Sequence, residues 1–467
     1  MNSIISYFSM DYILPKEQRK GTVPDTHTTY KHFMDTAWPA VLQGLLIQLA
    51  SVIDLAMVGS LGAAGLAAVG IFSQPKMALL IFVRALCMPI IAIVARRFGE
   101  GDYKNANATL KQGILLSFLV YIPLIFLSYH FMAEILYFAG ASDSFIESAT
   151  AFGRYVSIGL IFSAYSQIVG AGLIGVGNTK MIFYSNAIGN IVNTILNAFL
   201  IFGLWGAPRL GVEGAGIATM VGDIVTAIII TTAVCKKSSP LNLLDNSSWR
   251  FTYDTLHSIY HIGSSSLGEQ VFERFGMFTY TKMVASLGVV PLAAHHVCMA
   301  LCDIFYLLDQ GLSQASASHV GQSLGKKRPD MALAYGKVGT RVGLLFSIIG
   351  AISYIVFDET LLWMFSSDTK VIDLGQEILL IVALVCFPQS YQMVYSGVLR
   401  GAGDNYFVMV YSLISIAIVR PILTYVLCFP LGIGLFGAWI ALFIDQSTRM
   451  CCSYWRFKQG QWQTIKI

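Results

Sequence analysis

The chain has 467 residues, of which 55% are hydrophobic and 12% are charged, with a formal net charge of +4 at pH 7 and a mean hydropathy of +0.66. Soluble domains carry about 25% charged residues, so the composition excludes a soluble enzyme, and the weak net charge does not indicate a nucleic-acid partner. The abundance of aliphatic and aromatic residues excludes a disordered or fibrous chain. We therefore expect a protein that is embedded in a lipid bilayer.

The apolar runs are continuous and long enough for helices, whereas a membrane β-barrel would alternate apolar and polar residues. The sequence therefore predicts an all-α integral membrane protein. Twelve segments are long enough to span a bilayer. Their predicted limits are 34–59, 64–95, 108–136, 146–172, 180–203, 211–235, 257–286, 290–320, 334–364, 371–399, 405–430 and 434–456.

These segments divide the chain into two lobes of six spans. We expect an N-lobe over 34–235 and a C-lobe over 257–456, joined by a polar linker at 236–256. Residues 1–33 and 457–467 are predicted as tails, and no cleavable signal peptide is recognised.

The basic residues of the loops indicate the orientation. With the N-terminus inside, the inner segments hold nearly all of them, including Lys236 and Lys237, and the outer loops hold only Arg209 and Lys370. Because Lys and Arg favour the cytoplasmic side of a membrane, we expect both termini in the cytoplasm and the chain in an inner or plasma membrane.

The two halves of the chain repeat each other. VGSLGAAGLAA at Val58–Ala68 corresponds to VASLGVVPLAA at Val284–Ala294, 226 residues later, and the same offset pairs Gly113 with Gly339. Six spans per half place both halves in the same orientation, which is a parallel repeat. Two equivalent bundles suit alternating access, in which a central site opens to each side in turn.

Asp54 is the most unusual polar residue, because it lies deep in the first span with no other charge within ten residues on either side. Acids inside a membrane are rare and indicate function. Asp54 could bind a proton, or hold Na⁺ with amide oxygens; alternatively it only bonds a neighbouring helix. Asn190, Asn193 and Asn197 share one face of the fifth span, and Thr219 of the sixth could add a hydroxyl.

Glu269 and Glu273 lie at positions i and i+4 of the seventh span, on one helix face. Two such carboxylates rarely both ionise in a low dielectric, so they are candidates for a substrate or cation cavity. The alternative is a structural network with Arg274 or Lys282.

Other polar residues of the C-lobe are weaker candidates. Asp303 and Asp309 in the eighth span and Arg420 in the eleventh could line a cavity, or Arg420 could pair with one of these acids. For Asp223 and Asp445 a structural pairing is expected. The eight cysteines are expected to be small buried residues.

Pro39 in the first span frees a backbone carbonyl and permits a kink. Pro39 lies about four turns before Asp54. Bending of this helix could therefore be coupled to the charge state of Asp54, with Pro39 as a hinge.

Four motifs together resemble the multidrug and toxic compound extrusion (MATE) family. They are DLAMVGSLG at Asp54–Gly62, VASLG at Val284–Gly288 followed by LAAH at Leu292–His295, VGQSLG at Val320–Gly325, and SGVLRGAG at Ser396–Gly403. The resemblance extends from the first predicted span to the last. It implies a monomeric secondary antiporter in the cytoplasmic (inner) membrane of a bacterium. Such a protein exports organic cations, drugs or other amphipathic compounds in exchange for H⁺ or Na⁺, with no cofactor and no catalytic residue.

The resemblance also implies roles for individual residues. Asp54, Asn193 and Thr219 match the family's cation site, but an Asp that the family has four residues after Asn193 is Asn197 here. This loss of a carboxylate favours H⁺ as the coupling ion, with Na⁺ at Asp54 as the alternative.

Glu273 matches a Glu that some members use, and Glu269 matches the preceding Glu of bacterial members. A tenth-span Asp that partners Glu273 in some members is replaced by Gln389, so a second carboxylate is missing.

Two other functions stay open at this point. A flippase for a lipid-linked saccharide or lipid of the same superfamily would be expected to have more basic residues in its cavity than Arg84, Arg274 and Arg420. A channel or receptor would have no need of duplicated halves.

Overall fold

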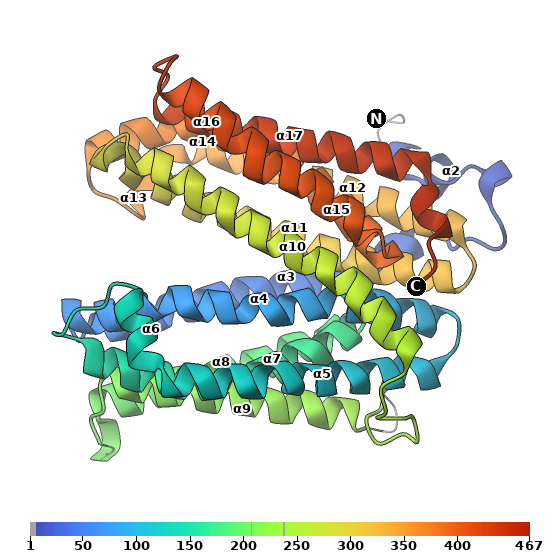
Figure 1. Cartoon of the computed structure of the whole chain (residues 1–467). Coiled ribbons are helices and arrows are strands. Elements are labelled where there is room, and N and C mark those ends of the chain that lie inside the picture. Colours follow the sequence, from blue (N-terminus) through green and yellow to red (C-terminus); the bar gives the residue numbers. More distant parts are fainter. Residues whose placement is uncertain (1–5, 207, 237–238) are drawn as a thin grey trace. The chain divides into compact units, whose positions relative to one another are not determined.

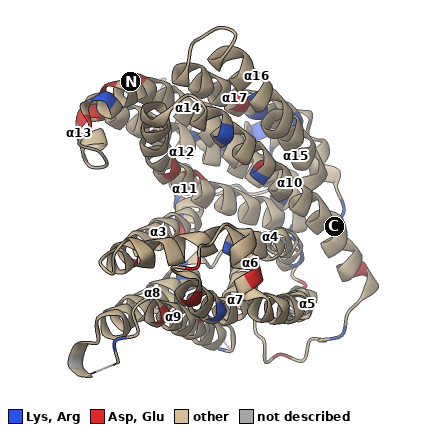
Figure 2. Ribbon diagram, turned by 60° about the vertical axis from the view of Figure 1, so that its left-hand side comes forward, with Lys and Arg blue, Asp and Glu red and all other residues tan. Residues whose placement is uncertain are grey.

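The computed structural model describes residues 6–206, 208–236 and 239–467, so Lys237 of the predicted linker lies outside the described residues. Within these ranges the chain forms helices and no strand (Figure 1). Most of the helical ribbon carries no charged residue (Figure 2). The chain divides into two compact units, residues 42–260 and residues 1–41 with 261–467.

The unit of residues 42–260, here called the N-unit, contains six elements that lie wholly inside it and one short 3₁₀ turn. They are α4 (Ala63–Gly99), α5 (Tyr103–His130), α6 (Met132–Phe138), α7 (Ile146–Gly175), α8 (Thr179–Phe202), η2 (Leu204–Gly206) and α9 (Val212–Val234). Helix α7 packs against α4, α5 and α9, and α8 packs against α9.

The second unit, here called the C-unit, is built around α11 and α14. Its elements are α2 (Met10–Ile13), η1 (Lys16–Gln18), α11 (Val289–Gly325), α12 (Pro329–Val356), α13 (Asp358–Trp363), α14 (Thr369–Ala402), α15 (Asn405–Ser412), η3 (Leu413–Val419), α16 (Arg420–Cys428), α17 (Leu435–Gln459) and η4 (Gln461–Thr464). At Gly397 and Gly401 of α14 the backbone of α11 lies so close that a Cβ would collide with Ser313 and Ala317.

Two long helices belong to both units. Helix α3 (Thr26–Gly59) is in the C-unit up to Val41 and in the N-unit from Leu42. Helix α10 (Tyr253–Ala285) is in the N-unit up to Tyr260 and in the C-unit from His261. The division between the units therefore falls inside two continuous helices.

The prediction of an all-α fold with twelve long helices is confirmed. In the described part of the chain, ten helices are long and apolar enough to cross a membrane. The other two, α10 and α17, stand where the seventh and twelfth spans were predicted. Several predicted limits were wrong by five residues or more. Among them, the third helix ends at His130, before α6, and the ninth ends at Val356, before α13.

The first helix begins at Thr26, eight residues before the predicted start at 34. The Asp25 carboxylate accepts a hydrogen bond from Thr28 N at 3.4 Å, and the Asp25 carbonyl accepts from Thr29 Oγ1 at 3.0 Å. An Asp before a helix satisfies its first free N–H groups. The first turns of this helix are polar, so a prediction based on hydropathy places the start of the helix too late.

The eleventh predicted span is interrupted rather than uniform. A π-helical segment, η3, separates α15 from α16, and Pro421 is the second residue of α16. Proline removes a hydrogen-bond donor from the helix interior, and π-type turns accommodate such a defect.

Each unit holds a polar strap that leads into a shared helix. The N-terminal strap (residues 6–25) precedes α3, and its Met10, Ile13 and Leu14 are buried in the C-unit with residues of α11, α12 and α14. The linker strap (residues 239–252) precedes α10 and lies on the N-unit, where Asn107 and Lys111 bind it. The linker is therefore part of a unit rather than a free connection.

Candidate functional site

Four residues predicted as a cation site come together in the N-unit. Asn197 Nδ2 donates to Asp54 Oδ1 at 2.7 Å and to Asn193 Oδ1 at 3.4 Å. Asn193 Nδ2 donates in turn to Thr219 Oγ1 at 3.4 Å. The result is one chain of hydrogen bonds that joins α3, α8 and α9.

Two glycines allow this arrangement. At Gly222 of α9, a Cβ would lie 2.8 Å from Asn193 Cβ and 3.0 Å from the Gly189 carbonyl oxygen. At Gly189 of α8, a Cβ would collide with Thr226. Helices α8 and α9 therefore touch backbone to backbone, which brings Asn193 within reach of Thr219.

Asn197 has an unused acceptor at this site. The residue is 1% exposed, and its Oδ1 is buried without a hydrogen-bond partner in the described part of the chain. An amide carries donors on one side and an acceptor on the other. Asn197 can therefore donate to an ionised Asp54, or rotate and accept from a protonated one.

Sequence reasoning missed two neighbours of this group. Lys76 of α4 is the cation whose charge acts on both Asp54 and Asp223. Asp223 lies one turn after Thr219 on α9 and contacts the backbone of α7 near Gly159. The spacing of four residues from Thr219 was the available signal, but Asp223 was expected to have a structural pairing.

The candidates in the C-unit do not form a single cluster. Glu269 pairs with Arg400 of α14 at 2.5 Å. Glu273, one turn along α10, is half-buried and forms no hydrogen bond or ion pair with the described residues, although its charge acts on Arg449. The two glutamates therefore have different surroundings.

Gln389 is buried and donates to Asp309 Oδ2 at 3.4 Å, so it faces α11. Asp303, on the same helix, is exposed. Pro39 lies buried inside α3, two residues before the boundary between the units at Val41.

Arg420 is 3% exposed and pairs with Asp445 of α17, not with Asp303 or Asp309. Asp445 also accepts from Ser415 Oγ at 2.6 Å and pairs with Arg449 at 3.0 Å. The expected structural pairing of Asp445 is therefore present. This network fixes α16 against α17 beside the π-helical segment.

The described residues contain no group of three or more His, Cys, Asp or Glu side chains that could hold a metal ion. Around Asp54, the ligands within reach are one carboxylate, two amides and a hydroxyl. Such a group can hold a proton on the Asp54 carboxyl, with an amide oxygen as the hydrogen-bond acceptor of the protonated acid.

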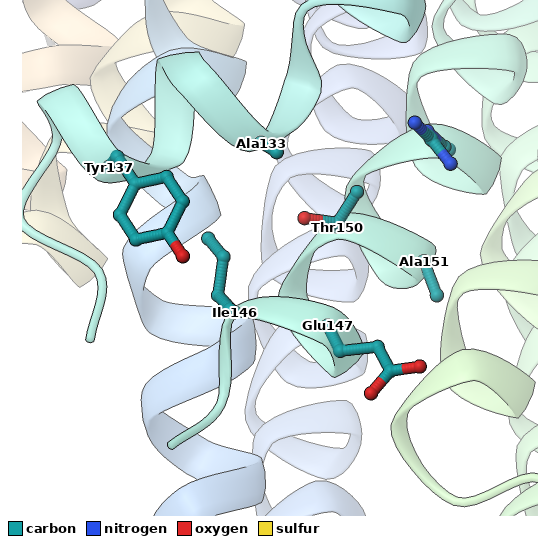
Figure 3. Close-up of a pocket in the computed structure, with 7 residues that line it drawn as sticks. Ala133, Tyr137, Ile146, Glu147, Thr150 and Ala151 are labelled. Carbon is teal, nitrogen blue, oxygen red and sulfur yellow. The ribbon is translucent and has the colours of Figure 1, made fainter. Parts of the chain in front are cut away.

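A surface pocket of about 390 Å³ lies elsewhere on the N-unit, between α6 and the start of α7. Figure 3 shows Tyr137 of α6 with Glu147 and Thr150 of α7 around it. The pocket contains none of the predicted site residues, so it is separate from the Asp54 group.

The duplicated helical units and the buried polar group of α3, α8 and α9 define a polytopic membrane transporter. The MatE family model matches the chain twice, over residues 39–199 and 266–426, once in each half. The chain therefore belongs to the MATE family. The predicted internal repeat is confirmed by the double match.

Curated relatives carry transporter names. The chain is 24% identical over 450 residues to the probable multidrug resistance protein NorM of Thermotoga maritima, which covers 96% of this chain and 95% of that protein. It is 26% identical to the multidrug resistance protein MdtK of Proteus mirabilis, over 76% of this chain and 78% of the relative.

Solved structures share the fold. A MOP superfamily transporter from Pyrococcus furiosus superposes with a TM-score of 0.86 at 18% identity, covering 94% of this chain and 97% of that one. A mutant of the Vibrio cholerae MATE transporter VcmN also gives 0.86 at 18% identity, over 93% of this chain and 97% of that one.

Proposed function

We propose that the chain is a secondary antiporter that exports organic cations, drugs or other amphipathic compounds in exchange for H⁺. The observation that carries the proposal is the hydrogen-bonded chain from Asp54 through Asn197 and Asn193 to Thr219. An acid placed among neutral donors inside a helical bundle is a functional site by default.

H⁺ fits this group better than Na⁺ as the coupling ion. A proton needs one carboxylate to bind it, and Asp54 supplies this group. The protonated acid then needs a hydrogen-bond acceptor, which the free Oδ1 of Asn197 can provide. Na⁺ would need several oxygen ligands and a negative charge that no other cation neutralises. Lys76 already acts on the Asp54 carboxylate as a competing cation. Na⁺ at Asp54 is the alternative.

On the substrate side, Glu273 is the acid that would meet an organic cation. Glu269 and Arg420 are neutralised by Arg400 and Asp445, so they shape the region rather than attract charge. Gln389 and Asp303 remain candidates for the cavity. The engagement of Arg420 by Asp445 also weakens the case for a flippase, which would need free basic groups.

Pro39 is proposed as a hinge of α3. It stands next to the point where α3 passes from one unit to the other, and a proline interrupts the helical hydrogen bonds there. Protonation of Asp54 would then be coupled to bending. Pro39→Ala should impair transport and leave folding intact; unaltered transport would contradict the hinge.

We further propose that the protein acts as a monomer in the cytoplasmic membrane of a bacterium, with both termini inside. The basic residues of the straps and inner loops support this orientation. Single cysteines placed in each tail and labelled from one side would test it.

The decisive experiment is uptake of a fluorescent organic cation into everted vesicles, whose lumen corresponds to the outside of the cell, with pH and Na⁺ gradients imposed separately. We expect the pH gradient alone to drive transport, and Asp54→Asn to abolish it. Glu134→Gln, an exposed acid of the same unit, is the matched control and should transport normally. Full activity of Asp54→Asn would overturn the assignment.

A further inference from the structure

A second acid lies inside the protein, in the C-unit. Asp309 of α11 is 0% exposed. Its Oδ2 accepts a hydrogen bond from Gln389 Nε2 of α14 at 3.4 Å. Its Oδ1 is buried and has no hydrogen-bond partner in the described part of the chain. One oxygen of a fully buried carboxyl group is therefore unoccupied.

Among the described residues, no positive charge compensates Asp309. The titratable groups that face it are Cys302 of its own helix, Cys386 of α14 and Tyr354 of α12. None of them is a cation, and the Tyr354 hydroxyl already donates to the Leu301 carbonyl oxygen at 2.8 Å.

Arg420, whose charge acts on Cys302 of the same helix, is paired with Asp445. Helix α3 approaches through Val41, which does not titrate. Burying an ionised carboxylate without a partner costs far more than burying a neutral acid. In this state of the protein, the neutral form is the one that fits.

We propose that Asp309 is a second proton-binding site, separate from Asp54, that is loaded and unloaded during transport. Loading forms an O–H bond at Oδ1, because Oδ2 already accepts from Gln389, and changes the group from −1 to neutral. Unloading returns the proton to water once α11 and α14 rearrange. This inference rests on the proposed exchange of H⁺.

The surroundings favour a proton over a metal ion. The polar side chains that act on the Asp309 carboxyl are the Ser390 hydroxyl and the Gln389 amide, both neutral groups of α14, and Gln389 Oε1 faces Cys302 Sγ at 3.7 Å. The described residues hold no group of three or more His, Cys, Asp or Glu side chains here, so a sodium ion would lack the set of ligands that a metal site needs.

Asp309 is also well placed to affect α3. Gly311, two residues along α11, packs against the α3 backbone: a Cβ there would lie 2.8 Å from Val41 N. Helix α3 continues from Val41 to Asp54. A change of charge at Asp309 would therefore act beside the helix that carries the first proton site.

The test is to count protons. The purified full-length chain in detergent and weak buffer receives tetraphenylphosphonium, and a pH indicator measures the protons released per chain. We expect Asp309→Asn and Asp54→Asn each to release one proton fewer than the wild-type chain, and the double variant to release none. Asp373→Asn, an exposed acid on α14, should match the wild type.

Two outcomes separate this inference from the proposed function. If Asp309→Asn is folded and releases as many protons as the wild type while Asp54→Asn does not, only the second site is wrong. If the wild-type chain releases no proton and Na⁺ alone drives efflux, the proposed H⁺ exchange fails.

A second variant covers the case in which Asp309→Asn does not fold. Gln389→Met keeps the acid and removes its hydrogen bond from Gln389. The midpoint pH of proton release should therefore shift, while the number of protons released per chain stays the same. An unchanged midpoint in that variant would overturn the second site.

Discussion

Lys111 and Lys337 occupy equivalent positions in the two halves of the chain, and each holds a strap by its main-chain oxygens. Their numbers differ by 226, the offset of the internal repeat. Lys111 Nζ donates to the carbonyl oxygens of Asp245 and Ser247 at 2.8 and 3.1 Å, and Lys337 Nζ donates to that of Ile13 at 2.9 Å. The repeat therefore preserves a strap anchor where it does not preserve a polar transport site.

Substituting these lysines should release the straps to different extents. Lys111→Met removes a buried lysine that pairs with the partly exposed Asp245 and donates to two strap carbonyls, which costs about 2–3 kcal/mol, whereas Lys337→Met loses one hydrogen bond, worth about 1 kcal/mol. Trypsin should then cut faster after Arg250 in the first variant and after Lys20 in the second. Lys104→Met, exposed on α5, is the control; identical cleavage rates in all three would contradict the anchoring role.

The linker strap should resist mild acid. Burial raises the pKa of the Asp245 carboxyl, but hydrogen bonds from Lys111 and Ser247 outweigh it and hold the pKa below its ordinary value of 3.8. Because the folded pKa is lower than the unfolded one, the ionised group stabilises the strap above the ordinary value, and this stability is lost only as pH falls through the lowered pKa. Hydrogen exchange of residues 239–252 should stay slow from about pH 7 to about pH 5. Asp245→Asn should be faster throughout; exchange in the wild type that rises already at about pH 6 would be inconsistent with the lowered pKa.

A glycine in the contact between α8 and α9 and a glycine on α7 give a matched pair of variants that should change the stability in opposite directions. Gly222→Ala forces a Cβ against Asn193 and the Gly189 carbonyl, which should cost about 1–3 kcal/mol and abolish efflux. Gly170→Ala on α7 meets only Ile182 at 3.6 Å or more, so it should gain about 0.5–1 kcal/mol from helix propensity. Thermal melting in detergent checks both. A tolerated Gly222→Ala with full efflux would show that Asn193 does not need its present position.

Asn197→Asp should change the ion that the site accepts. The new carboxylate would stand where Asn197 Nδ2 now lies 2.7 Å from Asp54 Oδ1. Two acids at this distance either share one proton or attract a cation. We expect efflux to gain a dependence on Na⁺ that the wild type lacks, measured in vesicles without a pH gradient. Efflux that remains independent of Na⁺ would argue that the second carboxylate does not determine the ion.

Substitution of Arg420 should lower the stability of the fold without changing the range of exported compounds. Arg420→Met leaves Asp445 buried with Arg449 alone, so we expect a loss of about 3–5 kcal/mol. The folded fraction should export the same compounds as the wild type. A stable variant with an altered substrate range would instead place Arg420 in the cavity.

The helices could be predicted from the sequence because continuous apolar runs leave few alternatives in a bilayer, and the family motifs supplied the candidates around Asp54. The partners of the ionisable residues could not be predicted. Arg420 had several acids within reach along the chain, and its pairing with Asp445 depends on how α16 turns after η3. The packing of the straps was missed for another reason. Both segments are polar, so their hydropathy predicted only a tail and a linker.

The sharing of α3 has a consequence for biosynthesis. Residues 6–41 pack with residues 261–467, and Lys20 N donates to the Asp330 carboxylate 310 residues further along the chain. At translation speeds of about 5–20 residues per second, roughly 15–60 s pass between the synthesis of these two residues. The N-terminal residues can therefore pack in their final position only after the second half of the chain has been synthesised. A chain truncated in its second half would leave these residues without a surface to bind.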